Sequence, residues 1–204
     1  MSGFYPFNPT LGQKIQSNVG GATQDASYIA HLQWTALEAI VAAAASLKAA
    51  TAVSADSTAT LIPTAQPSCA KNVSLTVGGT AGSIKAVQGK VYGIDLNDVE
   101  ITEDLPAFTV DTAGTVTGSK AFKAVTKVEI PAMDGAGVTV SIGHGEKLGL
   151  PYLLPCSTIL FGSKAAVREI TDPTVAYSAT VLSSNTIDFD SALDGSVMHA
   201  YLVV

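Results

Sequence analysis

The sequence predicts a mainly β protein, a β-sandwich or a barrel, preceded by an N-terminal Ala-rich α-helix and an extended arm. Short segments of alternating apolar and polar residues, separated by turn residues, fill residues 71–204. Within residues 25–50, apolar residues recur three and four positions apart, which is the period of a helix. Residues 1–24 precede both patterns and contain Pro6 and Pro9, so we expect an extended arm there.

Composition favours a folded chain. The 204 residues are 47% hydrophobic and 14% charged, with a mean hydropathy of +0.34, and a chain of this length can bury a sizeable core. The formal charge of -6, with 11 Lys and Arg residues, argues against binding nucleic acid through its phosphates. Neither a signal peptide nor an apolar run of about 20 residues occurs, so we expect neither export nor membrane insertion.

The arm carries an aromatic cluster. Phe4, Tyr5 and Phe7 lie within seven residues of the N-terminus and are flanked by proline. One interpretation is an arm folded onto its own domain. The other is an anchor, in which rigid aromatic side chains on an extended segment dock into a pocket on a partner. Phe4, Tyr5 and Phe7 are therefore the candidate partner-binding residues.

Asp25 is a candidate N-cap for the predicted helix, which we expect to continue to about Ala50. Its heptad-like seam contains Ile29, Leu32, Ala36, Ile40, Ala44 and Leu47. The opposite face lacks the charged cover of a surface helix, so the helix packs either on the β domain of the same chain or on copies of itself. We favour the second, with a self-association surface made by Ile29, Leu32, Ala36, Ile40 and Leu47.

Residues 51–70 are rich in Ser, Thr and Pro without a clear period and are predicted to form a linker. The β domain of residues 71–204 follows. Val138–Ile142 alternate apolar and hydroxyl side chains, and Glu100 and Thr102 alternate with Val99 and Ile101. His199, Tyr201 and Val203 are predicted to share one strand face. Short strands with no helix between them are typical of a sandwich or barrel.

No motif indicates an enzyme, a cofactor or a metal. Gly143–Gly149 resembles a phosphate loop, but Leu150 and Pro151 follow instead of a helix, so a connection between strands is expected. The three histidines lack a short metal-binding spacing. The carboxylates between Asp95 and Asp104 are expected on a solvated strand face. Cys69 and Cys156 are expected as small buried side chains, with a single disulfide as the alternative.

Lys71 to Pro151 resembles virion proteins of tailed bacteriophages, specifically small head-associated proteins of the capsid decoration or head-fibre kind. The stretches that carry the resemblance are Val91–Asp95, Val99–Leu105, Thr117–Val125 and Gly145–Pro151. The resemblance covers about 40% of the chain and implies an oligomeric β-sandwich protein on the capsid exterior, with no active site to transfer.

We therefore expect a non-enzymatic virion protein that is made in the host cytoplasm and binds the capsid exterior through its N-terminal region. The expected partners are the major capsid protein, or another virion protein, and copies of the chain itself, with a trimer favoured. Two alternatives remain open, a tail or baseplate accessory protein and a module that binds a host glycan receptor. A surface-polysaccharide hydrolase that uses Glu100 or Glu103 is disfavoured.

Overall fold

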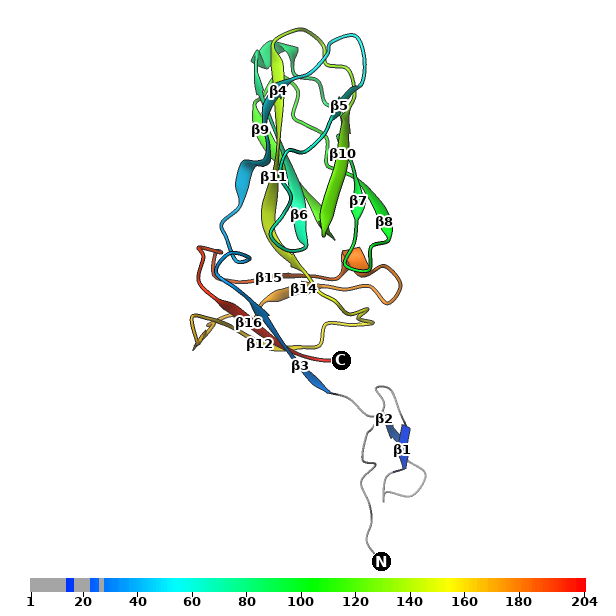
Figure 1. Cartoon of the computed structure of the whole chain (residues 1–204), viewed down its shortest axis with the longest axis vertical. Coiled ribbons are helices and arrows are strands. Elements are labelled where there is room, and N and C mark those ends of the chain that lie inside the picture. Colours follow the sequence, from blue (N-terminus) through cyan, green and yellow to red (C-terminus); the bar gives the residue numbers. More distant parts are fainter. Residues whose placement is uncertain (1–13, 17–22, 26–27) are drawn as a thin grey trace, which may run out of the picture.

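A computed structural model describes residues 14–16, 23–25 and 28–204 of the chain. This part is mainly β, as predicted, and all paired strands are antiparallel. The strands from β3 onward form two stacked bodies in an elongated molecule (Figure 1). The larger body contains β4 to β11, and the smaller body contains β3 and β12 to β16. A separate two-stranded ladder pairs β1 (Lys14–Gln16) with β2 (Thr23–Asp25).

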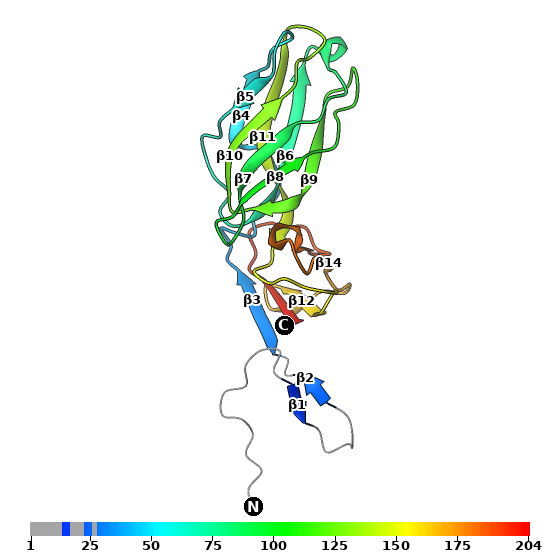
Figure 2. The same cartoon turned by 90° about the vertical axis from the view of Figure 1, so that its right-hand side faces the viewer.

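Two sheets face each other in the larger body (Figure 2). One has the strand order β5-β10-β7-β8, and its strands span Ala59–Leu61, Ala124–Ile130, Lys90–Ile94 and Glu100–Asp104. The other has the order β4-β11-β6-β9, and its strands span Ala43–Ala52, Val138–Gly149, Lys71–Gly79 and Gly114–Phe122. A short 3-10 helix, η1 (Ala81–Ser83), follows β6.

The core of the larger body lies between these sheets. One sheet contributes side chains at every second residue of β6 and β11, and the other contributes them from β7 and β10; they include Val73, Leu75, Val77, Val138, Val140, Ile142, Val91, Val128 and Ile130. Each is at most 1% exposed. Full burial of one such side chain contributes about 1.5–3 kcal/mol, so this two-residue period holds the sheets together.

The smaller body has its own core. Its four-stranded sheet has the order β13-β12-β16-β3, with strands at Val167–Arg168, Ile159–Lys164, Met198–Val203 and Ile29–Trp34. Opposite it lie β14 (Thr174–Ala176), β15 (Thr186–Asp188) and the end of β11, with the 3-10 helix η2 (Leu182–Ser184) between β14 and β15. The buried side chains between them include Trp34, Leu148, Leu150, Ile187, Met198 and Leu202.

β11 belongs to both bodies. Its first part pairs with β4 and β6, and its end pairs with β15 through Leu148 and Gly149. The register with β6 shifts between His144 and Leu148. The buried Asn72 side chain fills this irregularity, because its Oδ1 accepts the Lys147 N–H (3.1 Å) and its Nδ2 donates to a backbone carbonyl of β9 (2.9 Å). One continuous strand therefore connects the two cores.

The predicted helix over residues 25–50 is not formed in the part of that segment that the structure describes. β3 pairs with β16 over Ile29–Trp34, and β4 pairs with β11. Residues 26–27 lie outside the described residues. The inward side chains of β3 are Ala30, Leu32 and Trp34, which pack into the smaller core at a period of two. Burial against β16 therefore overrides the intrinsic helix propensity of the Ala-rich sequence.

A single helical turn remains from the predicted helix. The Glu38 carboxylate accepts both the backbone N–H (2.8 Å) and the hydroxyl (2.7 Å) of Thr35, while the N–H groups of Glu38 and Ala39 donate to the Thr35 carbonyl. Thr35 and Glu38 thus form much of a capping box. After this turn the chain enters β4, where Leu47 is the large side chain buried in the core. The helix that Thr35 and Glu38 could begin therefore does not continue beyond one turn.

The predicted linker is also corrected, because residues 51–70 belong to the larger body. They contain the end of β4 and all of β5, and Val53 and Leu61 are buried in its core. Gln66 pairs with Val125 of β10 as a strand residue would: its Nε2 donates to the Val125 carbonyl (2.9 Å) and its Oε1 accepts the Val125 N–H (2.8 Å). The side-chain amide of Gln66 thus makes the two hydrogen bonds to Val125 that a neighbouring strand backbone would otherwise make.

Candidate functional site

Of the predicted site residues, Phe4, Tyr5 and Phe7 lie outside the described residues. The five self-association residues do not form one surface. Ile29 is 66% exposed on the outer face of β3, whereas Leu32 points toward the smaller core. Leu47 is 1% exposed inside the larger body. Ala36 lies in the single helical turn and Ile40 in the connection before β4. The helical seam is therefore corrected, because strand geometry places these side chains on different faces.

An apolar groove of about 440 Å³ lies where the two bodies meet. Its floor and walls come from the segment after β11, from η2 and from the end of β16, and Asn97, Tyr152 and Thr158 are the side chains that carry a polar group. The lining is Asn97, Pro151, Tyr152, Leu153, Leu154, Pro155, Thr158, Leu182, Val203 and Val204. The Thr158 hydroxyl is buried and has no hydrogen-bond partner among the described atoms. The chemistry of this lining suits an apolar segment that also offers a polar group.

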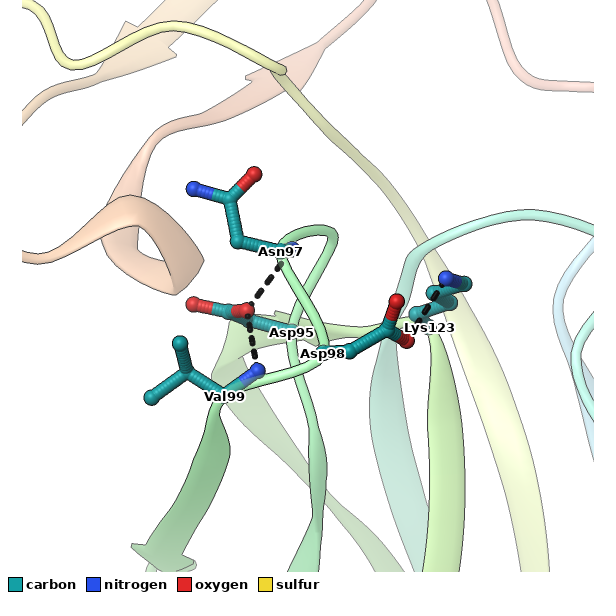
Figure 3. Close-up of polar contacts among 5 residues, drawn as sticks. All are labelled: Asp95, Asn97, Asp98, Val99 and Lys123. Atoms are coloured by element: carbon teal, nitrogen blue, oxygen red, sulfur yellow. Dashed lines mark hydrogen bonds and ion pairs between the residues drawn. The ribbon is translucent and has the colours of Figure 1, made fainter.

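The turn between β7 and β8 carries Asn97 to the groove (Figure 3). Asp95 is 5% exposed, and its Oδ1 accepts the N–H groups of Asn97 (2.8 Å) and Val99 (3.1 Å). Asp98 has a positive φ of 61°, a conformation that Asp tolerates better than most residues. Its carboxylate pairs with Lys123 at 2.7 Å. Asp95 and Asp98 therefore set the shape of this turn.

Asn185 holds the opposite wall of the groove. This side chain is completely buried, and its Oδ1 accepts the N–H groups of Leu154 (3.1 Å) and Ser178 (2.9 Å). Its Nδ2 donates to the carbonyls of Ser178 (2.9 Å), Val181 (2.9 Å) and Leu182 (3.3 Å). Nothing in the sequence around Asn185 singles it out, because Ser and Asn are also ordinary turn residues.

A row of stacked rings crosses the outer face of the smaller body's sheet. His31 stacks on Tyr201 (centroids 4.5 Å apart, planes within 2°), and Tyr201 stacks on Phe161 (4.5 Å, 23°). Arg168 covers the far side of Phe161 at 5.2 Å, and His199 lies beside His31. The predicted shared face of His199, Tyr201 and Val203 is confirmed by their alternation with buried residues. The ring faces contact one another, so they do not present the flat platform on which a sugar stacks.

Buried polar groups lie between the two bodies. Lys71 is 0% exposed, and its ammonium donates to the Ile40 carbonyl at 3.0 Å. Burial lowers the pKa of Lys71. His144 is 2% exposed; its Nδ1 lies 3.2 Å from the Gly145 carbonyl, and its Nε2 has no partner in the described part of the chain. Burial, aided by nearby Lys71, lowers the pKa of His144.

Glu100 and Glu103, the disfavoured hydrolase candidates, have different surroundings on β8. Glu100 is exposed, as predicted for a solvated face. Glu103 instead joins the two sheets, because its Oε1 accepts the N–H (2.7 Å) and hydroxyl (2.8 Å) of Ser119 and shares the Lys120 N–H with Oε2 (3.2 Å to each). A Cβ on Gly118 would lie 2.4 Å from Glu103 Oε2. Glu103 is thus a backbone-binding carboxylate at the β8–β9 edge.

Gly143–Gly149 is part of β11 and not a connection between strands, which corrects that prediction. The glycines are explained by close backbone approach, since a Cβ on Gly143 would lie 1.8 Å from the Ala43 carbonyl oxygen of β4. The cysteines are both free. Cys156 is exposed, contrary to prediction, because it lies on the surface segment after β11. Cys69 is half-buried, and burial raises the pKa of its thiol to about 11.

Within residues 14–16, 23–25 and 28–204, no three His, Cys, Asp or Glu side chains gather as ligands for a metal ion. The described residues also contain no helix long and apolar enough to cross a membrane. Comparison with known proteins finds no matching family, no similar curated protein and no similar solved structure.

Proposed function

We propose that the chain is a non-enzymatic structural protein of a tailed-bacteriophage virion, of the capsid decoration or head-fibre type. In this proposal the N-terminal region binds the capsid exterior and the larger body projects from it as a β-sandwich. Two observations support the proposal. The segment from Lys71 to Pro151 resembles such proteins, and the N-terminal region joins the fold at the smaller body, away from the tip of the larger body.

The observation that carries the proposal is the position of Tyr28 and Val204. Their backbones exchange two hydrogen bonds, Tyr28 N–H to the Val204 carbonyl (3.0 Å) and Val204 N–H to the Tyr28 carbonyl (2.9 Å). Both lie at the smaller body, and the larger body extends away from them (Figure 1). If the residues that precede Tyr28 bind the capsid, the larger body is therefore free to project away from it.

The aromatic arm supplies the binding chemistry in this proposal. Phe4, Tyr5 and Phe7 offer large apolar area at a low cost in conformational entropy, which is how aromatic anchors bind protein pockets. Individual contacts to a symmetric shell need only be weak if several chains of one oligomer bind at once, because linked sites raise the effective concentration of one another.

The test replaces Phe4, Tyr5 and Phe7 together by alanine in the full-length chain, encoded by the phage. Purified particles are then assayed for the chain by quantitative mass spectrometry. We expect at least a tenfold loss of particle-bound chain, with an unchanged circular dichroism spectrum and melting temperature for the purified variant.

A matched control is Tyr177→Ala, which removes a 53% exposed aromatic side chain from the smaller body and should leave incorporation unchanged. If the triple variant is incorporated like the parent, the arm is not the anchor. Parental particles that lack the chain altogether would overturn the virion function itself.

A further inference from the structure

Two histidines from different strands lie with their ring nitrogens in contact. His31 is on β3 and His199 on β16, and the register pairs His31 with Tyr201 and His199 with Gln33. The histidines are therefore diagonal neighbours on the outer face of the sheet. His31 Nε2 lies 2.9 Å from His199 Nδ1, which makes a hydrogen bond between the rings. His31 is exposed to solvent, and His199 is partly exposed.

The nitrogens face each other nearly head-on, because the ring centroids are 5.1 Å apart, so a modest reorientation of the rings would let both nitrogens bind one metal ion. Metal–imidazole bonds are about 2.0–2.1 Å long, so two nitrogens 2.9 Å apart subtend about 90° at the ion. An angle of 90° relates adjacent ligands in square-planar and octahedral sites, the geometries of Cu²⁺ and Ni²⁺. A tetrahedral Zn²⁺ ion needs nitrogens about 3.3 Å apart for the same bond lengths.

We propose that His31 and His199 form a two-histidine binding site for a divalent transition-metal ion, with Cu²⁺ and Ni²⁺ preferred over Zn²⁺. Imidazole is a suitable ligand for these metals, and Cu²⁺ binds nitrogen sites most tightly in the first-row series. Water fills the remaining coordination positions on the solvent side of the sheet. This site is independent of the proposed virion function.

The stacked rings limit how far His31 can move. Its ring lies 4.5 Å from that of Tyr201 with the planes 2° apart, and Phe161 in turn supports Tyr201. Such restriction lowers the entropy lost when the imidazole binds an ion, because fewer ring orientations must be given up. Arg168 covers Phe161 at the opposite end of the row from His31.

Each neutral imidazole has one protonated and one free nitrogen. In the metal-free pair, one ring donates its N–H to the other across the 2.9 Å contact. In the metal-bound pair, the free nitrogens are His31 Nε2 and His199 Nδ1, and each ring carries its hydrogen on the other nitrogen. The ion thus replaces a hydrogen bond with two coordinate bonds, and neither ring has to change its charge.

The experiment titrates the full chain with NiCl₂, and separately with ZnCl₂, at pH 7.5 by isothermal titration calorimetry. We expect one Ni²⁺ ion per chain, bound more tightly than Zn²⁺, and at least tenfold weaker Ni²⁺ binding for both His31→Gln and His199→Gln. One ion for every two chains, with a doubled mass, also supports the site, as a bridge between copies.

A gain-of-binding variant keeps the test independent of any loss of folding. Gln33 lies opposite His199 and two residues from His31 on the same face, so Gln33→His adds a third imidazole at this position. We expect at least tenfold tighter Ni²⁺ binding by this variant. Ni²⁺ affinity that is absent in the parent, or equal in the parent and both glutamine variants, would show that the pair is a hydrogen bond and no metal site.

Discussion

Asn185 makes more side-chain hydrogen bonds than its small size suggests, and all of its partners are backbone groups. Asn185→Ala leaves the N–H groups of Leu154 and Ser178 and three carbonyls without this partner. An unsatisfied buried polar group costs about 1–3 kcal/mol. We therefore expect a loss of about 3 kcal/mol or more in the free energy of unfolding, measured by urea denaturation followed by circular dichroism.

Two further variants separate the hydrogen bonds of Asn185 from its volume. Asn185→Asp keeps the acceptor but sets a second acceptor against the carbonyls of Ser178, Val181 and Leu182, so it should be as destabilising as alanine. Asn97→Ala, on the other side of the groove, removes an exposed amide and should change stability by less than about 0.5 kcal/mol. Wild-type stability in Asn185→Ala would refute this account.

His144 makes stability depend on pH. Burial lowers the pKa of His144 in the folded state, so, as the pH falls from neutral to acidic values, the unfolded chain takes up a proton before the folded chain does. Stability contributed by neutral His144 is thus present above the unfolded pKa and falls as the pH drops below it. We expect a smaller loss of unfolding free energy between pH 7.5 and 5.5 for His144→Gln than for the parent.

The same urea titrations at the two pH values provide the measurement. His31 and His199 occur in both proteins, so their contributions cancel in the comparison. An equal loss in parent and variant would mean that His144 is protonated alike in the folded and unfolded chains.

At the scale of elements, the sequence predicted strands within residues 71–204 where apolar and polar side chains alternate. Val138–Ile142 of β11 and Glu100–Ile101 of β8 follow the period of two, and the structure confirms them. β3 was missed because its alternation covers only six residues and overlaps an apolar spacing of three and four. The capping contacts between Thr35 and Glu38 hold one turn after β3, and the helix extends no further.

The candidate sites were less predictable than the fold, for a physical reason. The groove gathers Asn97, Leu154, Leu182 and Val203 from four separate segments, and no local period encodes such a meeting. The His31–His199 contact likewise depends on pairing β3 with β16 in the right register. Sequence reasoning placed His199 on a strand but placed His31 on a helix, so it could not bring them together.

β4 and β11 can approach closely at Gly143 because glycine has no side chain. A Cβ there would lie 1.8 Å from the Ala43 carbonyl oxygen, which is backbone and cannot turn aside. Gly143→Ala should therefore separate the two strands and lower the unfolding free energy by about 3 kcal/mol or more. Gly114→Ala is the matched control in β9, because its Cβ meets nothing within 4 Å. Urea denaturation compares them, and equal stability of both variants would contradict this prediction.

For the whole molecule, the exposed apolar side chains near β3 bear on how many chains associate. β3 ends its sheet, and Ile29 (66% exposed), Leu37 (78%) and Val41 (57%) are large apolar side chains on or shortly after it. Large apolar side chains that are left exposed are candidates for an interaction surface. Copies of the chain could cover this surface without the helical seam.

We expect light scattering after size exclusion to give three times the chain mass of 20.8 kDa at two protein concentrations. Leu37→Asp with Val41→Asp should reduce the mass to one chain, because each buries a charge at the proposed contact. Thr126→Asp on the exposed face of β10 should leave it unchanged. A parent that is monomeric at both concentrations would contradict the trimer.

The passage of β11 through both bodies also has a mechanical consequence. If the N-terminal region anchors the chain as proposed, tension between that end and the far tip of the larger body runs along this strand, parallel to its neighbours. The hydrogen bonds that join β11 to β4 and β6 then resist the force together, in shear, and do not break one after another. Beside Asn72 the ladder with β6 is interrupted, and fewer bonds resist there. Under stretching, the molecule should therefore yield at the waist between its two bodies while the larger body remains folded.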